Sequence, residues 1–182
     1  MALLRLGCKP IISLSDNTTE AKTLNIIYNM VAENVMSLGP WTSCTKRATL
    51  AQLTDEPEYG YTYQYQLPTD LKCLRVLEIN EDQLGSIEYR IEGDKLLTDE
   101  TSVQILYIGL LTDTESYDPY LRQAVTERLI VEMAYQRTGS ERNIEAMEKI
   151  FAAKVDAWLN INNTQGSSRD LPSNTFTDIR NE

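Results

Sequence analysis

The sequence predicts an α+β fold: a helical bundle, made of a long N-terminal helix and a C-terminal helical hairpin, with an inserted antiparallel β-region and an extended C-terminal tail. Three observations predict it. Apolar residues recur at helical spacing in two separate segments, the block between them alternates and turns as strands do, and the composition becomes polar after Leu159. We therefore expect the bundle at 1–53 and 118–160, the β-region at 54–117 and the tail at 161–182.

The first long helix is expected to start at Asn17, the candidate N-cap, with Glu20 in the capping-box position. An apolar stripe follows at spacings of three and four, formed by Ala21, Leu24, Tyr28, Val31, Val35 and Leu38. Ile26, Ile27 and Met30 lie off that stripe, so a second side of the helix is also apolar. We expect this helix to contact more than one neighbour.

Between the helical segments, residues 45–53 are interpreted as a short connection, and strands are expected near 60–66, 73–79, 86–91 and 103–109. The tripeptide Glu92-Gly93-Asp94 is expected to form a hairpin turn in which Gly93 takes a positive φ. Consecutive strands with such short connections favour an antiparallel meander.

Four tyrosines open the β-region. Tyr59, Tyr61, Tyr63 and Tyr65 alternate with less apolar residues, which places four rings on one face of an extended strand. Packing of a half-buried strand explains the pattern without a ligand. A carbohydrate-binding platform is the alternative that the four rings leave open.

Two helices are expected after the β-region. Asp118 is the candidate N-cap of the first, and Pro119 occupies its first position, where the missing N–H costs nothing. Gly139 can end this helix and Ser140 can begin the next, so the two should form an antiparallel hairpin. The first helix is apolar on several sides and should be central. The second carries one clean stripe, formed by Ile144, Met147, Phe151, Val155 and Trp158.

The charge of the chain is concentrated in its middle. The 182 residues have a net charge of −10, and residues 54–117 account for it with fourteen acidic and four basic side chains. A surface of this sign repels phosphates, so it disfavours tight nucleic-acid binding but allows DNA to slide past. No apolar stretch approaches the roughly 20 residues of a membrane span, so we expect a soluble protein that is intracellular when made.

Little in the sequence suggests chemistry. The chain contains no histidine, which removes the usual general base near neutral pH and histidine metal sites. No glycine-rich phosphate loop occurs, and Cys8, Cys44 and Cys73 form no Cys-x-x-Cys pair, so we expect reduced, buried thiols. Carboxylates in polar turns, such as Asp113 and Glu115, are better explained as solvated acids than as catalytic pairs or calcium ligands. We expect no enzyme activity, no metal and no cofactor.

Four segments, taken in order, resemble a known family over most of the chain. They are ALLRLGCKPIISLSD before the long helix, WTSCTKRATLA, YGYTYQYQLPTDLKCLRV and DPYLRQAVTERLIVEMAYQRTG. Together they resemble the tail tubular protein A, or head-to-tail adaptor, family of short-tailed bacteriophages. The resemblance implies a structural virion protein at the head–tail junction, made in the host cytoplasm. It implies a dodecameric ring beneath the portal protein that adds to the DNA channel and offers its far side to the tail nozzle protein, with no membrane partner and no sequence-specific DNA binding.

The resemblance also suggests roles for the apolar residues singled out above. Leu171, Phe176 and Ile179 in the polar tail become candidate portal-binding residues, although an unstructured terminus without a role is the alternative. Candidate nozzle or subunit contacts are Tyr61, Tyr63 and Tyr65, and candidate subunit contacts are Ile26, Ile27 and Met30. Two other classes stay open: a carbohydrate-binding or cell-wall-active tail protein, and a monomeric binding module.

Overall fold

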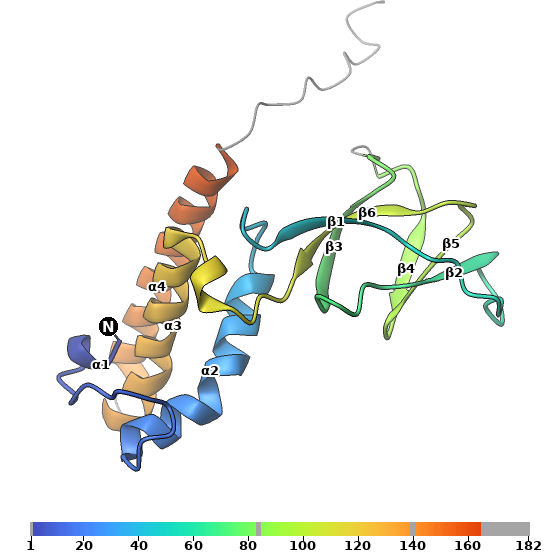
Figure 1. Ribbon diagram of the computed structural model, residues 1–182. Coiled ribbons are helices and arrows are strands. Elements are labelled where there is room, and N and C mark those ends of the chain that lie inside the picture. The colour runs from blue at the N-terminus through green and yellow to red at the C-terminus, as the bar shows by residue number, and fades with distance from the viewer. Residues whose placement is uncertain (1, 83–84, 139–140, 165–182) are drawn as a thin grey trace, which may run out of the picture.

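The computed structural model describes residues 2–82, 85–138 and 141–164, and it has a mixed α+β architecture. The helices gather at one end of the molecule and the strands at the other (Figure 1). The helices are α1 (Ala2–Arg5), α2 (Thr19–Ser37), α3 (Pro119–Thr138) and α4 (Glu141–Asn163), with one short 3₁₀ turn at Thr114–Ser116.

The strands form two antiparallel sheets of three strands each. The inner sheet, next to the helices, has the order β1-β6-β3, and the outer sheet has the order β2-β5-β4 (Figure 1). Their bounds are β1 (Thr45–Thr49), β2 (Tyr63–Gln66), β3 (Cys73–Ile79), β4 (Tyr89–Glu92), β5 (Lys95–Thr98) and β6 (Gln104–Gly109).

The expected helical bundle is wrong, because the four helices do not form one. Helix α3 lies between α2 and α4 and also contacts α1, as its several apolar sides predicted, but α2 packs against strand β3 as well. Periodicity identifies the buried face of a helix without saying what covers it. In this chain the inner sheet covers part of the α2 face that the prediction had assigned to other helices.

The expected meander is also wrong, although every strand pairing is antiparallel. Strand β1 lies in the segment interpreted as a connection, and it pairs with β6 so that Thr45 is opposite Ile108. Such a long-range pairing leaves no mark in the local sequence, whereas the β4–β5 hairpin does. Its turn forms at Gly93 with a φ of 62°, as predicted.

Two β-bulges adapt β3 to its position between two apolar cores. The register with β6 shifts between Cys73 and Arg75 and again between Val76 and Glu78. Each bulge adds a residue to one strand and reverses the side on which the following side chains lie. As a result Cys73 and Val76 pack towards the outer sheet, whereas Leu74 and Leu77, which follow them in the chain, pack on the core of the helices.

The helix starts follow from capping chemistry. Asp118 Oδ1 accepts hydrogen bonds from the backbone N–H groups of Tyr120 and Leu121, both at 2.9 Å, so the predicted N-cap of α3 is confirmed. Helix α2 starts one residue later than expected. Its N-cap is Thr18, whose Oγ1 accepts from the Ala21 N–H at 3.2 Å.

The connection from α2 to β1 ties the helices to the sheets. Trp41 is fully buried and its Nε1 donates to the Val35 carbonyl at 2.9 Å. Thr42 N–H donates to Asn162 Oδ1 of α4 at 2.7 Å, and Ser43 Oγ donates to Asp118 Oδ2 of α3 at 2.8 Å. Three successive residues therefore join α2, α3 and α4 where the inner sheet begins.

Replacing the shared cap should reveal how much this junction contributes. Asp118→Ala removes the acceptor for two α3 backbone N–H groups and for Ser43, so we expect the free energy of unfolding to fall by about 1–2 kcal/mol. Urea unfolding followed by circular dichroism measures the change. Asp118→Asn keeps an acceptor at Oδ1 and should lose less, and equal stability of the alanine variant and the wild type would contradict this account.

Candidate interaction surfaces

The three apolar α2 residues outside the main stripe do not share one environment. Ile26 is 78% exposed and Met30 is 52% exposed, one turn apart on the side of α2 that faces away from its neighbours. Ile27, in contrast, is partly buried and packs against the core of the helices. The α2 surface available to a partner therefore includes Ile26 and Met30. Ile27 is mostly covered by the core of the helices.

The four tyrosines do not form a single platform. Strand β2 begins only at Tyr63, and Gly60, with a φ of 91°, turns the chain before it. The alternation predicted from the sequence therefore applies to Tyr63 and Tyr65, both in the strand. Tyr59 stands free in solvent and Tyr61 is half-buried in the preceding loop.

Tyr65 is a core residue. It is 1% exposed, in the apolar core shared by the two sheets, and its hydroxyl donates to the Glu100 carbonyl at 2.7 Å. Burial raises the pKa of Tyr65, and the neighbouring Tyr63 and Glu100 raise it further. Tyr65 therefore fixes β2 on the core, and Tyr61 and Tyr63 are the members of the predicted contact set with exposed surface.

A broad acidic groove lies at the outer sheet, between the loop at 55–61 and the β4–β5 hairpin. Its volume is about 840 Å³. The side chains along it are Asp55, Glu56, Glu58, Tyr59, Tyr61, Arg90, Glu92, Asp94 and Lys95. Thr62, through both its N–H and Oγ1, donates to Asp99 at 2.8 and 2.7 Å, which anchors the end of the loop.

The acidity of the middle segment is exposed, and most of it lies in the loops and turns that connect the strands. Of the fourteen acidic side chains in 54–117, twelve are exposed, and only Glu78 and Asp82 are partly buried. The sheets and their connecting loops therefore present an excess of negative charge to any approaching polymer.

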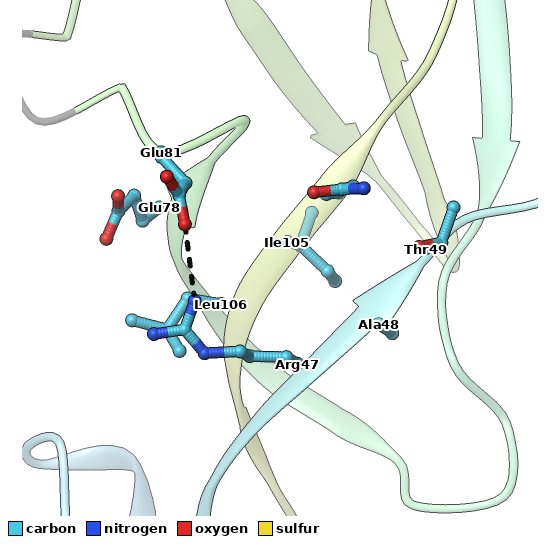
Figure 2. A pocket seen from close by; sticks show the side chains of 8 residues that line it. Arg47, Ala48, Thr49, Glu78, Glu81, Ile105 and Leu106 are labelled. Atoms are coloured by element: carbon cyan, nitrogen blue, oxygen red, sulfur yellow. Dashed lines mark ion pairs between the residues drawn. The ribbon is translucent and has the colours of Figure 1, made fainter.

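A second, smaller pocket of about 210 Å³ opens on the inner sheet (Figure 2). Arg47 of β1 and Glu81, just after β3, reach towards one another across β6 and form an ion pair of 3.7 Å. Both side chains are 65% exposed, so the pair contributes about 1 kcal/mol at most. Arg47 is therefore paired with the Glu81 carboxylate, which competes with any anion that enters this pocket.

The cysteine thiols are not placed for nucleophilic chemistry. Cys8 and Cys44 are buried and Cys73 is half-buried, and none of the three forms a disulfide, so burial is confirmed for the first two. Burial raises the pKa of Cys44 to about 11, more than its hydrogen bond with Ser43 lowers it. At neutral pH this thiol is protonated, whereas a nucleophilic cysteine needs a thiolate.

The part of the chain that the structure describes holds neither a cluster of metal ligands nor a membrane-spanning helix. Within it, no three acidic or cysteine side chains converge as metal ligands. No helix in the same residues has the length and apolarity needed to cross a bilayer. The predicted portal-binding residues Leu171, Phe176 and Ile179 lie outside the described residues.

Comparison with known proteins identifies no family or function for this chain. No protein-family model matches the chain, and no curated protein is similar to it in sequence.

Two of these features were missed by the sequence analysis. The Arg47–Glu81 pair joins residues that only the long-range pairing of β6 brings together, so no local pattern could have revealed it. The acidic groove joins two segments whose acidity was evident but whose contact depends on the pairing of β2 with β5. The composition could indicate the sign of this surface but not its shape.

The buried hydroxyl of Tyr65 gives a direct test of its place in the core. Tyr65→Phe leaves the Glu100 carbonyl without this donor, and we expect the free energy of unfolding to fall by about 1 kcal/mol. Urea denaturation measures the shift. Tyr59→Phe is the matched control, since Tyr59 is 88% exposed and its substitution should change stability very little. Equal losses in the two variants would contradict the assignment of Tyr65 to the core.

Proposed function

We propose that this chain is a structural virion protein, the head-to-tail adaptor of a short-tailed bacteriophage. Copies of it form a ring between the portal protein and the tail nozzle, and the ring lines the channel through which DNA is packaged and ejected. The proposal starts from the order of the four segments that resemble this family. It assigns the chain no reaction, because its role is assembly.

The observation that carries the proposal is the acidic surface of the two sheets. Of the twelve exposed carboxylates in 54–117, all but Asp113 and Glu115, which lie at the 3₁₀ turn beside the helices, belong to the strands of the two sheets and the loops that connect them. A channel for DNA has to keep the phosphate backbone near the wall without holding it, and like charge does this at every position along the polymer. A surface that bound DNA would instead need clustered lysine and arginine.

The helical part supports the assembly side of the proposal. Ile26 and Met30 leave apolar area in water on α2, and apolar area of this kind is typical of a contact surface. The polar tail begins where α4 ends, at Asn163, so α4 would carry the candidate portal-binding residues to their partner. In this arrangement the helices hold the ring and the portal, and the sheets face the nozzle.

Electron microscopy of the protein mixed with portal rings of the same virus tests the assembly. We expect an added ring of density on one face of the portal, with twelve copies. A variant lacking residues 165–182, which keeps α4 and the Thr42–Asn162 hydrogen bond, should lose portal binding in a pull-down. A protein that remains monomeric beside the portal would overturn the adaptor and favour a monomeric binding module.

Charge reversal tests the role of the acidic surface. Glu56→Lys, Glu58→Lys and Glu92→Lys, introduced together, should slow DNA ejection from assembled particles, most strongly at low salt, because lysines on the wall would hold phosphates. The control reverses Glu145 and Asp156, which are exposed on α4 and far from the groove in sequence. Ejection at the wild-type rate in low salt would show that this groove does not face the DNA.

A further inference from the structure

The apolar face of the outer sheet is left open at its β4 edge. Three residues lie in one row across this sheet, because Tyr65 of β2 pairs with Leu96 of β5, and Leu96 pairs with Ile91 of β4. Tyr65 is 1% exposed and Leu96 is fully buried, whereas Ile91 is 41% exposed. The row therefore runs from the core into solvent, and a further strand beside β4 would continue it.

The β4 edge also has backbone hydrogen-bonding groups that point away from the sheet. The two-residue turn at 93–94 makes Glu92 and Lys95 a hydrogen-bonded pair of the hairpin. Because such pairs alternate along an antiparallel ladder, the N–H and C=O groups of Tyr89 and Ile91 point away from β5. Among the described residues, β4 pairs with no second strand, and these groups take part in no hydrogen bond. An edge of this kind is a template for another strand.

The side chains of β4 indicate which strand fits there. Arg90 and Glu92 are exposed on the face opposite to Ile91 and form an ion pair of 3.2 Å. A second β4 strand, antiparallel and with Ile91 opposite its own counterpart, sets Arg90 of each copy opposite Glu92 of the other. Opposite charges in such cross-strand pairs are stabilising. The same placement sets Tyr89 opposite Gly93, where a Cβ would meet nothing within 4 Å, so this chain leaves room for the ring.

The neighbouring registers of two β4 strands are unfavourable. Moving the second strand by two residues sets Arg90 opposite Arg90 of the other copy in one direction, and Glu92 opposite Glu92 in the other direction. Like charges that lie directly opposite destabilise a pair of strands. Moving it by one residue sets the outward-pointing groups of one strand opposite the inward-pointing groups of the other, so the hydrogen bonds are lost. The sequence of β4 is therefore complementary to itself in a single register.

We propose that β4 is the contact of a two-fold dimer of this chain. The occupant of the edge is the β4 strand of a second copy, so that the two outer sheets join into one sheet in the order β2-β5-β4-β4-β5-β2. Ile91 of each copy exchanges N–H and C=O hydrogen bonds with Ile91 of the other, and the two side chains cover each other. The same patch is used by both copies, which is an isologous contact.

This dimer goes beyond the adaptor proposal and does not depend on it. A two-fold contact is complete with two copies, so it is not a contact that repeats around a ring. Its effect is on the free chain. Pairing the β4 edge removes a site at which other strands, including those of unfolded chains, would add and start aggregation.

Exchange of charges tests the contact in the full chain. In Arg90→Glu and in Glu92→Arg, each made alone, both cross-strand pairs become like charges, and we expect the dissociation constant of the dimer to rise about tenfold or more. Mixing the two variants makes both pairs attractive again, so a mixed dimer should form with the affinity of the wild type. Analytical ultracentrifugation measures the separate proteins, and native mass spectrometry of a mixture with one variant isotope-labelled measures the mixed dimer.

The matched control for Arg90→Glu is Lys149→Glu, which changes the net charge equally and is exposed on α4. It should leave the dimer intact. A wild type that stays monomeric up to millimolar concentration would overturn the inference. A dimer that survives in Arg90→Glu, or a mixture that forms no mixed dimer, would overturn it as well, whether or not rings form on the portal. A β4 dimer without rings on the portal would uphold this contact and overturn the adaptor role.

Hydrogen exchange gives a second measurement that needs no variant. The Ile91 N–H is free in one copy and bonded in two, so its exchange with solvent should slow as the protein concentration rises. An exchange rate that is the same at low and high concentration would overturn the contact.

Discussion

The whole molecule depends on the short connection at Trp41–Ser43. Trp41 is completely buried and bonds back to the last turn of α2, Thr42 is held by Asn162, and Ser43 is held by Asp118. The chain leaves the helices here and enters β1, so the direction of the inner sheet is set by hydrogen bonds to three helices. Gly39 lies close to α4 nearby, and a Cβ at that position would lie 2.5 Å from Leu159 Cδ1, so the leucine side chain would have to move.

This junction allows one chain to maintain two apolar cores. Strand β3 contributes to both, and its two bulges are the physical means, since a regular strand would place Leu74 and Leu77 on alternate faces. Lys72, the residue before β3, forms an ion pair with Glu33 of α2 on the surface, which adds a contact between the inner sheet and this helix. Helices and sheets are therefore joined by a buried tryptophan, hydrogen bonds, an ion pair and the apolar contacts of β3.

The sequence predicted the features that depend on neighbouring residues. The start of α3 at Asp118-Pro119 and the turn at Gly93 were correct because each is specified by a few adjacent side chains. Strand β1 was missed, since TKRAT is half-exposed and its partner β6 is distant. Of the candidate contacts, Ile26 and Met30 are exposed in this structure, whereas Tyr65 is buried, because alternation identifies a face without identifying which side is covered.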